Sequence, residues 1–207
     1  MLNRRMSGFS LIELAIALTI IAIMTVMGAP LLSLWQANSQ VRLVADALQN
    51  DLRQAQAEAV RRNRQVAVAL TNGTPNTINP AFTPLLTARN WTLVSLPLLG
   101  STEGANEASG STGFILAHAQ NSNTATTITG SVSIICFNSV GRLVAPATLI
   151  ANAGGVTCGA LPVPPAQITF DISNASADRR LRVQIQTGGQ IRMCDRDRSI
   201  TTQADGC

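Results

Sequence analysis

The chain begins with a long apolar stretch. No charged residue occurs from Leu14 to Val41, and the positions from Leu14 to Met27 are almost all aliphatic. The 26 residues of Phe9–Leu34 would form a helix about 39 Å long, which is enough to cross a bilayer with some tilt. We therefore expect a transmembrane helix over 9–34.

The helical pattern continues beyond this stretch. Apolar residues recur with the period of one helix face at Leu34, Val41, Ala45, Leu48, Leu52, Ala55 and Ala59. Glu58 and Arg62 stand one turn apart in the favourable order. The sequence thus predicts one helix from Phe9 to about Arg64, amphipathic over 35–64. Because Pro30 removes a backbone donor, we expect a kink near Gly28–Pro30.

After this helix the pattern changes to the two-residue period of strands. The predicted strands are Gln65–Leu70, Trp91–Leu99 as far as Pro97, Phe114–His118, Thr126–Phe137, Arg142–Val144, Ala166–Ile172, Leu181–Gln186 and Ile191–Cys194. A hairpin turn is predicted at Thr187–Gln190 (TGGQ), and loops at Thr71–Arg89, Gly100–Gly113 and Ala145–Pro165. We expect an α+β fold, in which the long helix packs on a mainly antiparallel β-sheet head over 65–207.

Composition excludes several classes of enzyme. All 15 basic residues are arginine, and without lysine the chain has neither a P-loop nor a Schiff-base nucleophile. The single histidine, His118, cannot form an HExxH zinc site, and no GxSxG motif occurs. We interpret His118 as a packed or edge residue of a strand, and expect no catalytic site, no cofactor and no metal.

The residues before the apolar stretch carry positive charge. Met1–Gly8 (MLNRRMSG) places Arg4 and Arg5 where they would hold this end of a membrane helix on the cytoplasmic side. A secretory signal peptide cleaved near Gly28–Ala29 is the alternative. Two features oppose it: Glu13 lies near the start of the apolar run, and the helical pattern continues past that cleavage point.

The segment Gly8–Leu14 (GFSLIEL) resembles the prepilin signature of type IV pilins and type II secretion pseudopilins. The resemblance implies a leader peptide over 1–8, cleavage by prepilin peptidase after Gly8, and N-methylation of Phe9. It also implies that Glu13 is the acidic assembly residue, and Pro30 falls where such pilins commonly have a kinking proline. A protein of this kind lies in the bacterial inner membrane with its head in the periplasm, and joins other pilins through helix packing in a pilus or pseudopilus.

The physics of a carboxylate in apolar surroundings fits this role. An ionised Glu13 in hydrocarbon costs several kcal/mol unless it is paired. Cleavage creates an amine on Phe9, and that amine on a neighbouring subunit would supply the partner. Subunit addition would then neutralise a buried charge. The alternative is a Glu13 side chain that reaches the membrane edge.

The head carries two further landmarks. A long helix followed by Cys136–Arg142 (CFNSVGR) and a late hairpin ending in Gly188–Cys194 (GGQIRMC) resembles the GspH/FimT branch of minor pilins and pseudopilins. Members of this branch prime or cap a filament as low-abundance subunits, and some FimT-like members bind DNA during uptake. The resemblance extends over nearly the whole chain.

The four cysteines form no CxxC motif, which argues against a four-thiolate zinc site. In an oxidising compartment they would form disulfides, for which three pairings exist. We favour Cys136–Cys158 and Cys194–Cys207, because each closes the shortest loop. The second would fasten a C-terminal tail that has no apolar pattern of its own.

Arginines gather near the C-terminus. They are Arg179, Arg180, Arg182, Arg192, Arg196 and Arg198. Such a cluster suits phosphate and is typical of nucleic-acid binding. DNA-binding FimT-like proteins carry Gly-Arg-x-Arg in this region, whereas this chain has Gly189-Gln190-Ile191-Arg192. Asp195 and Asp197 alternate with the last arginines, and the tail has no aromatic residue for base stacking.

Two interpretations of this cluster remain open. One is a DNA site, formed by Arg180, Arg182, Arg192, Arg196 and Arg198. The other is a solvated face that pairs with the aspartates or with neighbouring subunits. Loss of Met1–Gly8 would lower the formal charge from +4 to +2, while Arg179–Cys207 holds six arginines and three aspartates, or +3. The basic charge therefore lies at the C-terminal end.

Overall fold

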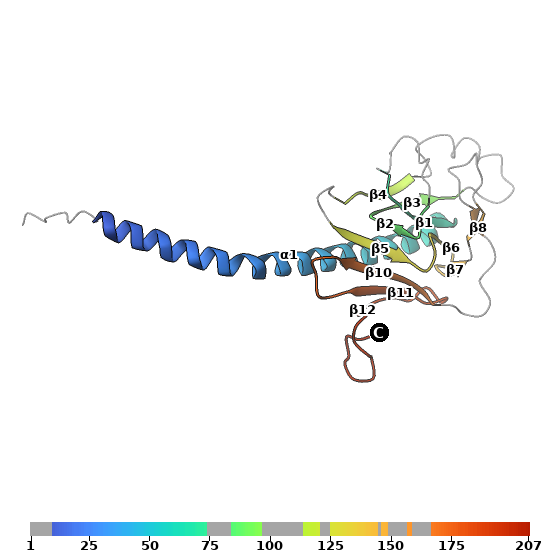
Figure 1. Ribbon diagram of the computed structural model, residues 1–207. Coiled ribbons are helices and arrows are strands. Elements are labelled where there is room, and N and C mark those ends of the chain that lie inside the picture. Colours follow the sequence, from blue (N-terminus) through green and yellow to red (C-terminus); the bar gives the residue numbers. More distant parts are fainter. Residues whose placement is uncertain are drawn as a thin grey trace, which may run out of the picture.

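One helix, α1 (Leu11–Arg62), runs through the head and protrudes from it as a stalk (Figure 1). The computed structural model describes residues 10–73, 84–96, 114–120, 125–144, 146–148, 157–158 and 167–207. At 52 residues α1 is about 78 Å long. It ends before the predicted Arg64 because Asn63 adopts a left-handed backbone (φ 51°), a common helix terminator.

The predicted amphipathic stripe faces the core. Val41, Ala45, Leu48, Leu52, Ala55 and Ala59 are all fully buried. Leu34, the first member of the stripe, is only half-buried, because the head begins to cover α1 after that point. The helix continues through Pro30 without a break, and Figure 1 shows a gentle curve along its length. A kink at Pro30 itself stays a prediction.

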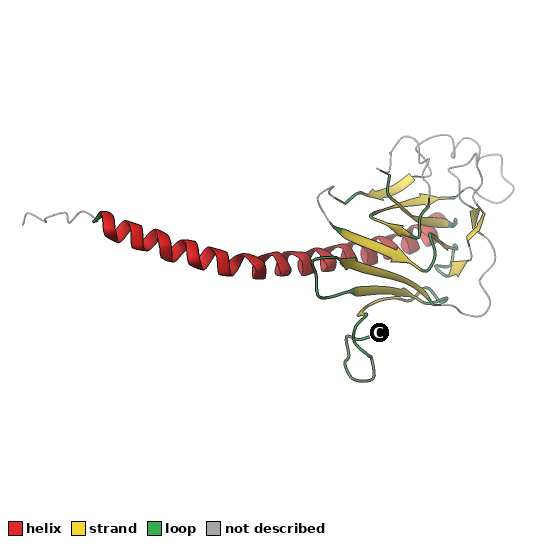
Figure 2. Cartoon of the chain, viewed as in Figure 1, coloured by secondary structure: helices red, strands yellow, loops and turns green. Residues whose placement is uncertain are grey.

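The predicted α+β class is confirmed, with the strands divided between two antiparallel sheets beside α1 (Figure 2). The first has the order β4 (Phe114–His118), β3 (Asn90–Ser95), β1 (Val66–Thr71), β6 (Ile134–Phe137) and β7 (Leu143–Val144). The second has the order β12 (Ile191–Asp195), β11 (Leu181–Ile185), β10 (Ile168–Asn174), β5 (Thr126–Gly130) and β2 (Thr87–Ala88). β8 (Pro146–Thr148) pairs with β9 (Thr157–Cys158).

Three of these strands fall where loops were predicted. β2 lies in the predicted loop Thr71–Arg89, and β8 and β9 lie in Ala145–Pro165. They have two or three residues each, too few to show a two-residue period.

The single strand predicted over Thr126–Phe137 is wrong. The chain leaves β5 at Gly130 and enters β6 of the other sheet at Ile134. A Cβ on Gly130 would lie 2.4 Å from the Val132 carbonyl oxygen and 2.9 Å from the Phe170 ring. Glycine at this position therefore permits the tight crossing between the sheets, and the apolar alternation across it conceals the break.

The two sheets differ in burial. β1 is buried along its whole length, because Val66, Val68 and Leu70 join the main core with α1 while Ala67 and Ala69 join a second core on the opposite face. β10 alternates buried and half-exposed residues, so the second sheet packs one face on α1 and presents the other to solvent. This outer face carries several of the C-terminal arginines.

The stalk lies outside both cores. Every side chain from Ser10 to Val26 is exposed, and those from Leu11 onward are mostly aliphatic. Within the described part of the chain, no helix has a stretch long and apolar enough to span a membrane.

Candidate functional site

The N-terminal site lies at the tip of the stalk. Glu13 is exposed in the first turn of α1, where a negative charge interacts favourably with the helix dipole. Gly8 and Phe9, the predicted cleavage and methylation residues, lie outside the described residues, as does the whole leader over 1–8. Their roles therefore stay predictions.

The C-terminal arginines lie at the outer face and edge of the second sheet, and acidic partners surround them. Arg179 Nη2 is 2.9 Å from Asp195 Oδ2, and Arg180 makes a two-pronged contact with Asp197. Arg198 Nη1 is 2.8 Å from Asp205 Oδ2. These pairs agree with the interpretation of a face neutralised by its own aspartates.

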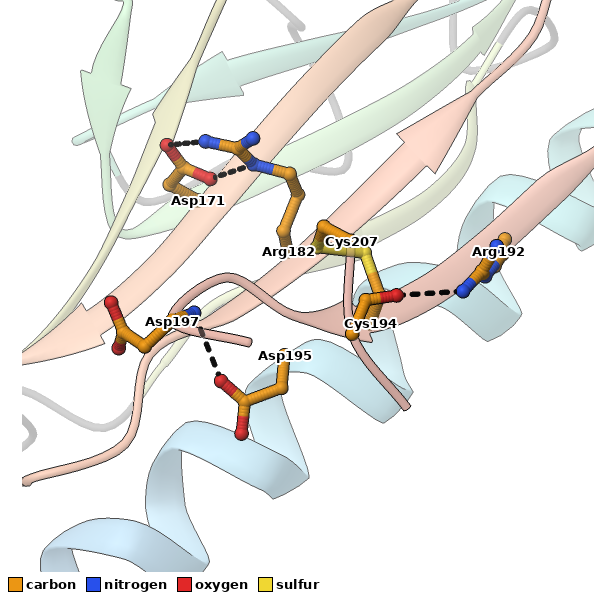
Figure 3. Close-up of a disulfide and its surroundings, with 8 residues drawn as sticks. Asp171, Arg182, Arg192, Cys194, Asp195, Asp197 and Cys207 are labelled. Carbon is orange, nitrogen blue, oxygen red and sulfur yellow. Dashed lines mark hydrogen bonds and ion pairs between the residues drawn. A yellow bond between two sulfur atoms is a disulfide. The ribbon is translucent and has the colours of Figure 1, made fainter. Parts of the chain in front are cut away.

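Asp171, which the sequence analysis did not single out, joins two further arginines. It stands directly opposite Arg182 in the β10–β11 register, and Arg182 Nε is 2.6 Å from Asp171 Oδ1 (Figure 3). Arg196 Nη1 approaches the other oxygen of the same carboxylate at 3.2 Å. The turn predicted at Thr187–Gln190 joins β11 to β12 and does not set this pairing. β10 and β11 are joined through residues 175–180, where the sequence analysis predicted no turn, so the pair was missed.

The charge of this cluster is nearly balanced. Six arginines meet five aspartates, the fifth being Asp178 beside Arg179, which leaves a formal charge of +1. The hydrogen bonds from Arg180 lower the pKa of the Asp197 carboxyl, and the same contact raises the pKa of Arg180. The guanidinium groups are half-exposed, but their strongest partners lie within the chain.

A disulfide between Cys194 and Cys207 fastens the tail against β12, the pairing that the sequence analysis favoured (Figure 3). The tail extends the edge of the sheet, because Gly206 bridges Asp195 in parallel and the Cys207 amide donates to the Asp195 carbonyl at 3.2 Å. Arg192 Nη2 donates to the Gly206 carbonyl at 2.7 Å. Arg192, like the other five arginines of the cluster, therefore has a partner within the chain.

Cys136 is buried in β6 and is disulfide-bonded. The side chain of Cys158, its predicted partner, lies outside the described residues, so this pairing stays a prediction.

The two glycine-containing segments of the head, Cys136–Arg142 and Gly188–Cys194, come together beside the C-terminal half of α1. Gln56 Nε2 donates to the carbonyl of Gly141 at 2.7 Å and to that of Gly189 at 3.2 Å. Gly141 belongs to the CFNSVGR segment and Gly189 to the GGQIRMC segment, and both have positive φ angles of 76° and 89°. One helix side chain therefore joins a turn of the first sheet to the hairpin of the second.

His118 lies on β4, the edge strand of the first sheet, and its ring stacks on Trp91 with centroids 4.1 Å apart. Trp91 Nε1 donates to Asp51 Oδ2 at 2.8 Å, and His118 Nδ1 is 3.4 Å from the same oxygen. This is a packed edge histidine, as predicted. Within the described ranges, no group of His, Cys, Asp and Glu side chains is arranged to hold a metal ion.

The chain is similar to known protein families and to solved structures. The family described as type II transport protein GspH matches residues 44–206, and the prokaryotic N-terminal methylation motif matches residues 3–29. Among solved structures, the type IV minor pilin FimU of Pseudomonas aeruginosa is 17% identical over 75% of this chain and 88% of its own, with a TM-score of 0.45. The minor pseudopilin EpsH from the type 2 secretion system of Vibrio cholerae is 16% identical over 75% of this chain and 96% of its own, with a TM-score of 0.37. No curated protein matches the chain.

Proposed function

Because this chain belongs to the GspH family of type II transport proteins, we propose that it is a minor pilin or pseudopilin subunit that assembles into a type IV pilus or a type II secretion pseudopilus. The observation that carries the proposal is the exposed, apolar half of α1, which ends in a single carboxylate, Glu13. An exposed apolar surface of this length needs a membrane or other helices to cover it.

Processing comes first in this proposal. Prepilin peptidase cleaves after Gly8, and Phe9 becomes the methylated first residue. The match of the methylation motif over 3–29, which includes both residues, supports this step.

Anchoring follows from the charge pattern. Arg4 and Arg5 hold the N-terminus on the cytoplasmic side, and the charge-free segment from Leu14 to Val41 crosses the inner membrane once. The head, with its disulfides, then lies in the periplasm, an oxidising compartment. We propose that the subunit primes or caps its filament.

Assembly depends on Glu13. Its carboxylate pairs with the Phe9 amine of the next subunit, so that two charges that are costly in an apolar environment neutralise each other. The pairing also fixes the register between successive helices.

The test compares Glu13→Ala and Glu13→Asp in cells that assemble the filament, with leader cleavage followed by mass spectrometry. We expect both variants to be cleaved and membrane-bound. Glu13→Ala should be absent from sheared filaments, whereas Glu13→Asp, which keeps the charge, should be incorporated in part. Incorporation of Glu13→Ala at the wild-type level would contradict the proposal.

DNA binding in uptake, through the C-terminal arginines, is the alternative. It requires guanidinium groups that are free to contact phosphate. All six arginines of the region contact carboxylate or carbonyl oxygens of the chain itself. These contacts within the chain therefore weigh against DNA binding by this cluster.

A further inference from the structure

A groove of about 390 Å³ lies between α1 and the hairpin of β11 and β12, close to the point where the stalk enters the head (Figure 1). This volume is within the range of sites that hold a small organic group. Val41 of α1, with Leu181 and Met193 of the hairpin, gives it an apolar part. Trp35 is the lining residue nearest the N-terminus of α1, and it is 71% exposed. The groove therefore combines apolar walls with an exposed aromatic ring on the side of the stalk.

Charged side chains of both signs also line the groove. They are two arginines and two aspartates: Arg42, Arg179, Asp195 and Asp205. Asp195 is buried and its Oδ2 is 2.9 Å from Arg179 Nη2, so these two groups satisfy each other. Arg42 and Asp205 are both exposed.

These two exposed groups retain capacity for a ligand. Arg42 Nε is 3.8 Å from Asp46 Oδ2, which is longer than a hydrogen bond. Arg179 and Arg198 both approach Asp205 at one oxygen, Oδ2. Within the described part of the chain, the Arg42 guanidinium and the other oxygen of Asp205, Oδ1, are therefore left for a group from outside.

The groove begins where the predicted membrane helix over 9–34 ends. Trp35 is the next residue, and tryptophan is enriched at the level of lipid headgroups. Arg42 lies on the same face of α1 two turns later, about 10 Å further along the axis, and its side chain is long enough to reach that level. On the stalk, the exposed Ile21, Met24 and Leu32 continue this face at helical spacing. One face of α1 thus passes from aliphatic to aromatic to charged, which is the order of polarity in one leaflet of a bilayer.

We propose that this groove binds the headgroup of a zwitterionic phospholipid, with the phosphate at Arg42, the ammonium group at Asp205 and the acyl chains along Ile21, Met24 and Leu32. The inference rests on the proposed function, because it requires the stalk to lie in a membrane. It adds a lipid site at the junction of stalk and head, formed jointly by α1 and the disulfide-fastened tail.

The charges of the groove favour a zwitterionic headgroup over an anionic one. An exposed guanidinium such as that of Arg42 attracts the phosphate of either class. The carboxylate of Asp205 attracts an ammonium group, but it repels a headgroup that carries only negative charge. Because two arginines and two aspartates line the groove, a headgroup of zero net charge leaves no charge there uncompensated.

Quenching of tryptophan fluorescence tests the occupant. The full chain is reconstituted in vesicles of phosphatidylethanolamine and phosphatidylglycerol in equal amounts, with brominated acyl chains on only one of the two lipids. Both preparations have the same headgroup composition, so a difference in the quenching of Trp35 reports which lipid lies beside it. Trp35→Phe gives the background from Trp91, which is buried in the head. We expect quenching to be about twofold stronger with bromine on phosphatidylethanolamine, the size expected from one exposed ion pair.

Charge variants test the two contacts. Asp205→Asn and Arg42→Gln should each remove the preference for phosphatidylethanolamine. Glu58→Gln and Arg53→Gln are the matched controls, because they remove the same charges from α1 outside the groove, and both should keep it. Equal quenching by the two lipids in the wild type, stronger quenching from phosphatidylglycerol, or the same loss in the controls would overturn the proposal.

Flotation of the same vesicles separates this proposal from the function on which it rests. Wild-type protein that floats with the vesicles but shows no preference between the lipids would overturn the lipid site alone. Wild-type protein that does not float with the vesicles would overturn the proposed membrane anchoring, and the lipid site with it.

Discussion

Gly189 and Gly141 are in direct backbone contact: a Cβ on Gly189 would lie 2.2 Å from the Gly141 carbonyl oxygen. Gln56 Nε2 would be 2.5 Å from the same Cβ. This close approach lets one amide of α1 bond to two carbonyls from turns in different sheets. Both glycine-containing segments therefore pack at one point on α1.

Gly189→Ala should therefore be strongly destabilising. Its left-handed backbone alone costs an alanine about 1–3 kcal/mol, and the contact with Gly141 adds to this. Gly188→Ala is the matched control, because nothing lies within 4 Å of a Cβ at that position. In thermal unfolding of the full chain in detergent, the melting temperature should fall clearly for Gly189→Ala only. Equal melting temperatures for the two variants would contradict a structural role for the Gly189–Gly141 contact.

Gln56→Ala tests the bridge from the helix side. It leaves two partly buried carbonyls without their hydrogen-bond donor, and such unsatisfied groups lower the stability of the fold by about 1–3 kcal/mol. Gln54→Ala, two positions away on α1 and exposed, removes the same side chain without losing these bonds. The expected result is lower stability for Gln56→Ala alone, measured by denaturant unfolding. Similar losses in both variants would indicate an effect of helix propensity instead.

The sequence predicted well what depends on local pattern. The helix stripe from Val41 to Ala59, the Thr187–Gln190 hairpin and the Cys194–Cys207 pairing all follow from spacing along the chain. The division into two sheets does not, because apolar alternation continues on both sides of Gly130 and contains no information about which sheet each half joins.

Contacts between distant residues were missed for the same reason. Gln56 is 85 residues from Gly141 and 133 from Gly189, so no periodicity connects them. Asp171 and Arg182 face each other across β10 and β11, and no turn was predicted in the connection over residues 175–180 that would set the register of these strands.

Removal of the disulfide by the double variant Cys194→Ser, Cys207→Ser should release the tail. Its loop has a sequence separation of 13, for which the chain-entropy estimate is about 3 kcal/mol. The amides of Asp195 and Cys207, which now bond to the opposing segment, should lose protection from hydrogen exchange. Ile200→Ala, an exposed change within the same tail, is the control. Unchanged protection in the double variant would show that the tail is held without the disulfide.

Acid should weaken the end of α1. Hydrogen bonds from Arg61 and then Arg62 lower the pKa of Glu58. A carboxyl with a lowered folded pKa stabilises the fold above its unfolded value, about pH 4, and that contribution disappears as pH falls through the folded pKa. Glu58→Gln should therefore lower the free energy of unfolding by about 0.3–0.5 kcal/mol for each ion pair lost at pH 7, and by almost nothing near pH 2. Asp46→Asn is the control: its partner Arg42 is 3.8 Å away, so this variant should lose less stability at pH 7. If Glu58→Gln remains less stable than the wild type in acid, the stabilisation does not come from the ion pairs.

A binding measurement with duplex DNA distinguishes the two interpretations of the arginine cluster. Because Asp171 neutralises Arg182 and Arg196, we expect wild-type protein to bind a labelled duplex weakly or not at all at physiological salt. Asp171→Asn raises the local formal charge from +1 to +2 and frees both guanidinium groups, so it should increase binding at low salt, with an affinity that falls steeply as salt rises. Glu58→Gln adds the same charge near the C-terminal end of α1, where Glu58 pairs with Arg61 and Arg62, and should not change binding. Tight wild-type binding that Arg192→Ala with Arg196→Ala abolishes would instead establish a DNA site, because it would show that phosphate displaces the internal partners of these arginines.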